Sequence, residues 1–173
     1  SLYVAVIGKD AIVDGVNIVG AHIDSPRLDI KPMPLIEKSG TALFKTQYYG
    51  GIKKYQWMSI PLAMYGVIYN KDGEKIKIAI GENDDDPVFT IADLLPHLAK
   101  DQMKSNANDF IDPEKMSVLV GSLKDQEADE KTSEKVKQNV LKILHAKYGI
   151  EEIDFVRRET SSVTALKTTL NGA

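Results

Sequence analysis

A short apolar strand that runs into Gly-Ala-His-Ile-Asp constrains this chain more than any other stretch. The run from Val16 to Val19 predicts a buried strand of a mixed or parallel sheet, and Gly20 marks its end. His22 and Asp24 follow at the C-terminal edge, where open α/β sheets place their chemistry. Side chains alternate along an extended chain, so these two point the same way. A metal-ligating imidazole usually donates its other N–H to a carboxylate, which is the pair that this spacing supplies.

A structural histidine is the alternative, because His-x-Asp often occurs by chance. The succession of strand, glycine, His-x-Asp, Ser-Pro-Arg and second strand favours the metal interpretation. We interpret His97 and His145 as helix-flank residues that face solvent or bond locally. A catalytic metal needs about three protein ligands and an open position. The chain offers His22 alone, so any partner ligands are expected on sequence outside it.

Composition excludes several function classes. The 173 residues carry a net charge of -3 and no cysteine. The acidic balance argues against a nucleic-acid surface, and the lack of cysteine excludes disulfides and thiolate ligands and fits a cytoplasmic protein. No apolar run approaches the roughly 20 residues that span a bilayer. Because the chain starts directly in a predicted strand without an initiator methionine, we expect a fragment of a larger protein.

Periodicity and turn signals predict an α+β fold of mixed and antiparallel strands with two main helices. The strands are expected at residues 3–7, 16–21, 27–33, 41–49, 60–69, 75–80, 116–120 and 153–156. The helices are expected at residues 90–104 and from about 133 to Tyr148, with Gly149 as the residue after the second helix. Residues 82–87 predict a solvated acidic turn, because their spacing does not match a calcium loop.

One further segment is a candidate interaction surface. Gly50 and Gly51 lie beside Lys53, Lys54 and Trp57, a combination that suits a close-packed contact loop between subunits. The alternative is an ordinary bend with Trp57 in the core.

Four blocks, in order, resemble the bacterial branch of the aspartyl aminopeptidase family of dinuclear zinc aminopeptidases. They are the segment from Gly20 to Lys31, the segment from Tyr48 to Trp57, the segment from Asp86 to Leu98, and residues 150–156. The resemblance covers roughly residues 3–156 and well under half of a family chain.

The resemblance implies that His22 ligates one zinc of a pair and that Asp24, counted with the catalytic residues, orients it. The zinc pair would activate a water that attacks the peptide bond beside a free N-terminus, with a glutamate as base. That glutamate and the other ligands lie downstream in the family, so the fragment alone should be inactive. Residues 1–34 would be partial catalytic strands, and residues 35–156 an inserted lid or dimerisation domain that builds homo-oligomers.

Two segments depart from the family. Lys53, Lys54 and Tyr55 stand where eukaryotic members carry a histidine that reaches a neighbouring site. From Arg157 the sequence no longer follows the family strand, so we expect residues 157–173 to be a truncation end or a foreign extension outside the sheet.

Of two other functions, one remains open and one is excluded. A non-catalytic oligomerisation or binding module with a structural His22 is the alternative function. A self-contained hydrolase that uses His22 and Ser25 lacks an oxyanion site.

Overall fold

The computed structural model describes residues 2–22, 26–70, 72–128, 133–156 and 159–166. In this part of the chain, six strands form one sheet in the order β4-β3-β6-β1-β2-β5. They are β1 (Arg27–Lys38), β2 (Thr41–Tyr49), β3 (Leu62–Tyr69), β4 (Lys75–Ile80), β5 (Val118–Gly121) and β6 (Glu159–Leu166). Their pairings are antiparallel. The described part of the chain is therefore a mostly antiparallel β fold with one α-helix, where an α+β fold with two main helices was expected.

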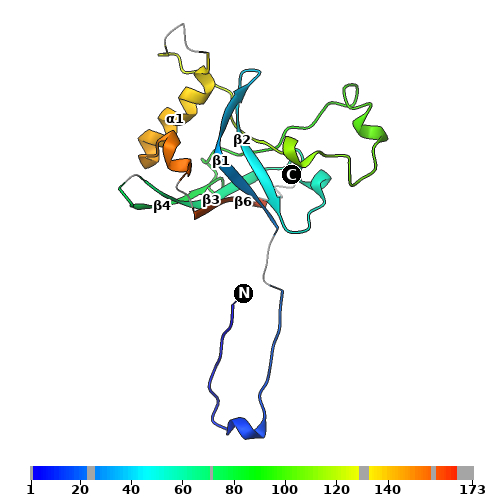
Figure 1. Cartoon of the computed structure of the whole chain (residues 1–173), viewed down its shortest axis with the longest axis vertical. Coiled ribbons are helices and arrows are strands. Elements are labelled where there is room, and N and C mark those ends of the chain that lie inside the picture. Colours follow the sequence, from blue (N-terminus) through cyan, green and yellow to red (C-terminus); the bar gives the residue numbers. More distant parts are fainter. Residues whose placement is uncertain (1, 23–25, 71, 129–132, 157–158, 167–173) are drawn as a thin grey trace.

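One α-helix, α1 (Lys135–Tyr148), packs against β1, β2 and β5 of this described sheet (Figure 1). Its buried side chains are Val136 and Val140, one helical turn apart. The helix ends as predicted at Gly149, whose φ of 66° lies in the left-handed region that glycine adopts without strain.

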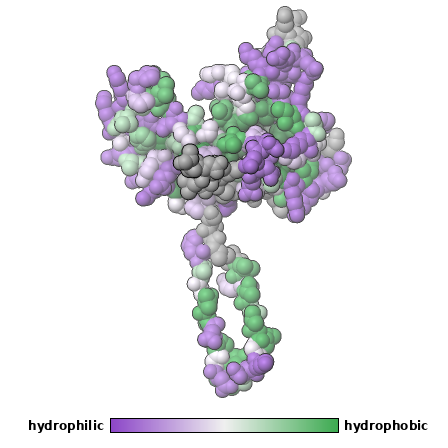
Figure 2. Space-filling view, turned by 180° about the vertical axis from the view of Figure 1, so that it is seen from behind, coloured by the Kyte–Doolittle hydropathy of each residue, from purple (hydrophilic) through white to green (hydrophobic). Residues whose placement is uncertain are grey.

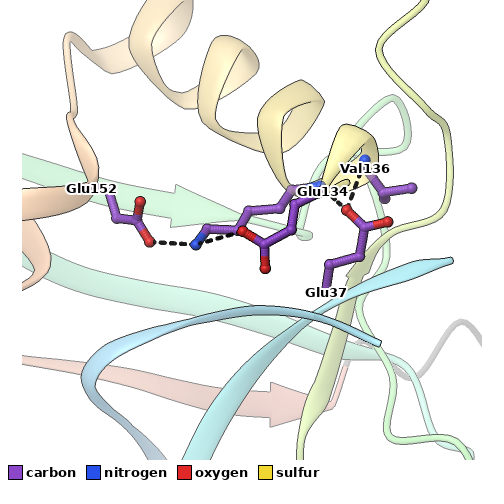
Figure 3. Close-up of polar contacts among 5 residues, drawn as sticks. Glu37, Glu134, Val136 and Glu152 are labelled. Carbon is purple, nitrogen blue, oxygen red and sulfur yellow. Dashed lines mark hydrogen bonds and ion pairs between the residues drawn. The ribbon is translucent and has the colours of Figure 1, made fainter. Parts of the chain in front are cut away.

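The start of α1 is held by a residue distant in the sequence. The Oε2 atom of Glu37 accepts hydrogen bonds from the backbone N–H groups of Val136 at 2.9 Å and Lys137 at 3.0 Å (Figure 3). The Lys137 ammonium in turn lies 2.9 Å from Glu152. A carboxylate at a helix N-terminus accepts hydrogen bonds from free N–H groups and interacts favourably with the positive end of the helix dipole. This contact therefore fixes α1 to the end of β1.

The hairpin of β3 and β4 confirms the alternation predicted for it. Asn70 organises the turn through its Oδ1 atom, which accepts from the backbone N–H groups of Asp72 and Glu74. Along β4, Ile78 and Ile80 are buried whereas Lys75 and Lys77 are exposed. One face of this hairpin therefore joins the core and the other faces solvent.

The prediction of a first helix at residues 90–104 is wrong. This stretch is irregular and ends in the short 3-10 helix η3 (Gln102–Lys104). The carboxylate of Asp93 accepts from the backbone of Leu94 and from the side chain of Gln102, which stabilises a loop in place of a first helical turn.

The predicted strand at residues 153–156 is also wrong. These residues lie in the 3-10 helix η5 (Glu152–Val156). The Phe155 ring packs edge-on against Phe44 of β2 at a centroid distance of 5.5 Å. The apolar side chains of this stretch thus reach the core from a tight turn, which the sequence pattern does not distinguish from a strand.

Strand β1 is longer than expected, since Pro32 and Pro34 do not end it. The pairing with β2 shifts register between Ile30 and Leu35, and Met33 adopts a φ of 47° at this irregularity. A bulge frees the positions where a proline could not donate to the ladder, so the strand continues beyond it. The boundary expected at residue 34 falls inside this strand.

Strand β6 contradicts the expectation that the tail lies outside the sheet. It pairs with β1 on one side and with β3 on the other, with breaks in register along β3. Backbone hydrogen bonding alone can recruit a segment rich in threonine and serine between two open strand edges.

The strands expected at residues 3–7 and 16–21 are not formed. Residues 2–22, here called the N-terminal arm, run away from the sheet as two legs joined by the short 3-10 helix η1 (Ile12–Asp14) (Figure 1). The large apolar side chains of the arm are 66–95% exposed, and they colour both legs in Figure 2. No described strand pairs with the arm, so its apolar pattern lacks the partner that would make it a strand.

Candidate functional site

His22 stands at the end of the N-terminal arm, just before the chain enters the sheet. Its side chain is exposed, and it is not sealed among aliphatic residues as a structural core histidine would be. Asp24, its proposed partner, lies outside the described residues, as does Ser25. The structure therefore places the imidazole within reach of solvent and leaves the His22–Asp24 pair as a prediction.

The segment after β2 begins beside the segment that carries His22. Gly50 has a φ of 81°, and a Cβ atom built on it would lie 3.7 Å from the Cα atom of Pro26. Arg27 and Tyr49 are paired in the ladder at this end of the hairpin. The two segments singled out from the sequence thus leave the sheet at one point.

The predicted contact residues are partly exposed. Gly50, Gly51 and Lys53 face solvent, whereas the Lys54 ammonium donates to the backbone oxygen of Asn108 at 2.9 Å. Trp57 closes the 3-10 helix η2 (Lys54–Trp57) and packs, half-buried, against the core. Trp57 therefore fits the alternative of a bend anchored in the core, and the intersubunit contact of Gly50, Gly51 and Lys53 stays a prediction.

The described residues do not supply a complete metal centre. Across them, no group of three histidine, aspartate or glutamate side chains could hold a metal ion. His97 and His145 are exposed and lie in the loop after Pro96 and on α1, respectively, apart from His22 in the fold. A single imidazole is one ligand of the three or so that a catalytic zinc requires. The donor set present in this part of the chain does not by itself fit a zinc ion.

The acidic segment at residues 82–87 is the turn that its spacing predicts. Asp86 accepts hydrogen bonds from the backbone N–H groups of Gly81 and Asn83 and from the Asn83 side chain, at 3.0–3.1 Å. The backbone N–H groups of Asn83 and Gly81 lower the pKa of the Asp86 carboxyl below its ordinary value. This carboxylate therefore organises the loop.

A hollow of about 680 Å³ lies elsewhere, among the irregular segments from residue 92 to residue 115. Leu94, Leu98 and Phe110 line it together with the carboxylates of Asp93 and Asp109. His22 and the contact segment after β2 do not belong to its lining, so it is separate from the candidate site.

Sequence reasoning missed a charged cluster at the open end of the β1–β2 hairpin. The guanidinium carbon of Arg27 lies 3.9 Å from the centre of the Tyr49 ring. Its Nε atom donates to the Oδ1 atom of Asp29 at 2.9 Å. The available signal was the spacing of two between Arg27 and Asp29 in a strand, which puts both on one face.

No helix in the described part of the chain combines the length and hydrophobicity that a membrane crossing requires.

Comparisons with known proteins give a consistent result. The model of the family described as "Aminopeptidase I zinc metalloprotease (M18)" matches residues 2–173. A probable M18 family aminopeptidase 1 from Clostridium acetobutylicum is 48% identical over 166 residues, covering 96% of this chain and 35% of the relative. One from Thermotoga maritima is 53% identical over 156 residues, covering 90% of this chain and 34% of the relative.

Two solved structures have the same fold. The crystal structure of the M18 aminopeptidase from Thermotoga maritima matches with a TM-score of 0.75 and 53% identity, over 82% of this chain and 30% of that one. The crystal structure of aminopeptidase I from Clostridium acetobutylicum matches with a TM-score of 0.77 and 46% identity, over 90% of this chain and 34% of that one. The chain thus spans about a third of the length of the relatives it matches. With a match that extends over nearly all its residues, the chain belongs to the M18 family of aminopeptidase I zinc metalloproteases.

Proposed function

We propose that the complete protein containing this chain is a zinc aminopeptidase that removes the N-terminal residue from peptides. The observation that carries the proposal is the family match over residues 2–173, which includes the His-x-Asp segment. The exposed side chain of His22 supports its role as a ligand of one zinc, with Asp24 orienting it. The lack of cysteine fits a cytoplasmic enzyme, and the net charge of -3 gives no support for nucleic-acid binding.

The remaining zinc ligands and the general base would come from sequence outside this chain. Among the described residues no three histidine, aspartate or glutamate side chains come together to hold a metal ion, whereas a catalytic zinc needs about three protein ligands. We therefore expect the 173-residue chain alone to be inactive. Residues 1–34 would contribute to a catalytic domain, and residues 35–156 would form an inserted lid or dimerisation domain.

The same proposal includes a homo-oligomer in which the segment after β2 contacts a second subunit. The exposed Gly50, Gly51 and Lys53 support this, since small residues allow close approach of two backbones. Lys54 and Trp57, which are held by Asn108 and the core, would give that surface a fixed shape. Reversal of the charge in Lys53→Glu should weaken self-association measured by analytical ultracentrifugation.

A non-catalytic oligomerisation or binding module with a structural His22 is the second candidate. The exposed apolar side chains of the N-terminal arm favour it, because such a surface is suited to association. This candidate predicts self-association and no zinc in the complete protein.

The deciding experiment measures zinc content and aminopeptidase activity of the complete protein. We expect chelator-sensitive turnover of an aminoacyl chromogenic substrate, lost in His22→Ala together with bound zinc. Asp24→Asn should lower activity or zinc affinity by about 10–100-fold. His145→Ala is the matched control, because His145 is an exposed histidine on α1 and its loss should change neither quantity. Zinc binding and activity that survive His22→Ala would contradict the proposal, and chelator-sensitive turnover by the 173-residue chain alone would contradict the incomplete site.

A further inference from the structure

Strand β6 fills a slot between two halves of the described sheet. The sheet order β4-β3-β6-β1-β2-β5 places the β3–β4 hairpin on one side of β6 and the strands β1, β2 and β5 on the other. The Cα partners across the slot include Leu28 with Val163 and Asp29 with Ser162 toward β1, and Tyr65 with Ser162 toward β3. Within the sheet of the described residues, the main chain of β6 therefore joins the two halves (Figure 1).

The walls of this slot belong to the core, so the folded chain needs the slot filled. Leu28 on β1 and Leu62 and Met64 on β3 are at most 5% exposed. An empty slot would leave two strand edges with unpaired backbone N–H and C=O groups beside these apolar side chains. A segment that enters the slot therefore gains main-chain hydrogen bonds on both of its sides.

The pairing of β6 depends little on a pattern of large side chains. Its ladder with β3 shifts register at two places. Val163 and Leu166 are the only large apolar residues in the sequence from 159 to 166. Register is strongly specified where large apolar side chains alternate and weakly specified where they do not. The slot thus selects an extended main chain, as a sheet edge does when a peptide adds to it as a further strand.

A short connection joins β6 to an anchored part of the fold. The 3-10 helix η5 ends at Val156 and β6 begins at Glu159, so residues 157–158 alone connect them. Phe155 of η5 is 3% exposed and packs on Phe44 of β2, which holds the near end of the connection in place. Elements on short connections exchange between identical copies at low cost, because the second copy offers the same slot.

We propose that the slot between β1 and β3 is a strand-binding site whose partner is the segment of residues 159–166 from a second copy of this chain. In the resulting strand-exchanged dimer, each β6 pairs with β1 and β3 of the other copy. The strand of the same chain has the advantage of a high effective concentration, so exchange is favoured by refolding at high protein concentration. Exchange needs neither zinc nor peptidase activity, and it uses a different surface from the segment after β2.

Cysteine pairs across the slot test the exchange, since this chain has no cysteine of its own. One copy carries Tyr65→Cys and the other carries Ser162→Cys, at positions that are opposite each other in the ladder. The two variants are unfolded together in urea, refolded at high concentration and treated with oxidised glutathione. We expect a disulfide between the two chains, because exchange brings these positions of different copies within disulfide distance.

Tyr65→Cys mixed with Ala79→Cys is the matched control. Ala79 is opposite Tyr65 on its other side, within the β3–β4 hairpin, whose turn at Asn70 pairs the two strands inside one copy. The pair across the slot should give about tenfold more interchain disulfide than this control. Both mixtures carry Lys53→Glu, so that association through the segment after β2 does not contribute. Equal yields in the two mixtures would overturn the proposal.

The length of the connection before β6 gives a second measurement. Deletion of Arg157 and Arg158 should raise the dimer fraction measured by analytical ultracentrifugation, since β6 then no longer reaches its own slot. Insertion of Gly-Ser-Gly-Ser after Val156 should lower the dimer fraction, because a longer connection lets β6 return to its own slot without strain. A dimer fraction that neither change alters would overturn the proposal, whatever the cysteine variants show.

Discussion

The N-terminal arm and the β3–β4 hairpin have similar sequence patterns and different fates. Both combine short runs of branched apolar residues with a glycine-containing connection, and both predict paired strands. In the hairpin, Ile68, Ile78 and Ile80 are at most 7% exposed. In the arm, Ile7, Ile18 and Val19 are at least 88% exposed. An apolar strand pattern therefore predicts a strand only where a partner is present to bury it. In the described residues, the hairpin has such a partner and the N-terminal arm does not (Figures 1 and 2).

The largest expected effect separates a core residue from an arm residue. Phe44 is 3% exposed and packs against Phe155, whereas Tyr3 is 92% exposed. Phe44→Ala should lower the free energy of unfolding by about 3–5 kcal/mol, because it removes buried contacts and leaves a cavity. Tyr3→Ala should change it by less than about 0.5 kcal/mol. Urea denaturation measures both, and similar losses would show that the arm is packed in solution.

A smaller effect is expected where the body of the fold depends on a contact between distant residues. Glu37→Gln should cost about 1–2 kcal/mol, since the charged acceptor for the Val136 and Lys137 N–H groups is lost. Glu127→Gln is the control, because the Glu127 side chain is 88% exposed. Its cost should stay below about 0.5 kcal/mol. Equal losses of unfolding free energy in the two variants would contradict the role of Glu37 at the start of α1.

Glycines provide a finer comparison of the two regions. Gly149 has a φ of 66°, so Gly149→Ala should cost about 1 kcal/mol in the free energy of unfolding. Gly8 in the arm lacks a left-handed φ, and a Cβ atom added to it would meet no other described residue within 4 Å beyond its chain neighbours. Gly8→Ala should therefore stay within about 0.5 kcal/mol of the wild type. Urea denaturation again measures both variants, and a larger cost at Gly8 than at Gly149 would reverse the comparison.

The smallest expected effect concerns the loss of stability at acidic pH. The Lys142 ammonium, 2.7 Å from Asp125, and the backbone N–H of Glu127 lower the pKa of the Asp125 carboxyl below its ordinary value of 3.8. A lowered pKa means that the folded state binds fewer protons, so this stability is present above pH 3.8 and is lost as the pH falls through the folded-state value. In Asp125→Asn, the melting temperature should therefore fall less steeply with decreasing pH than in the wild type. This acidic part of the plot of melting temperature against pH is called the acid limb.

Asp14→Asn in the exposed arm is the control for the acid measurement and should keep the wild-type acid limb. Thermal unfolding followed by circular dichroism between neutral and acidic pH makes the comparison. An unchanged limb in Asp125→Asn would contradict the role of the Lys142 contact.

Much of the β architecture was predictable because its signals are local. The strand at residues 41–49 and the turn before it follow from alternation and from Ser39-Gly40. The end of α1 at Gly149 follows from the need for a left-handed residue. The resemblance that led to the M18 family likewise rests on short segments whose order along the chain is enough to identify it.

The rest required contacts that no local pattern encodes. The helix predicted at residues 90–104 gave way because Asp93 and Gln102, nine positions apart, bond to each other. The tail entered the sheet because β1 and β3 both offered open edges. The contact between the Arg27 guanidinium and the Tyr49 ring arises only when β1 and β2 pair in register.

The sequence by itself determined which segments tend to extend, where the chain turns, and which family it belongs to, since these depend on neighbours along the chain. The tertiary structure decided which apolar segments find partners, what holds the start of α1, and that the segments of His22 and Gly50 leave the sheet side by side. The physical reason is that burial and hydrogen bonding are satisfied between residues distant in sequence, and only the folded arrangement shows which of them meet.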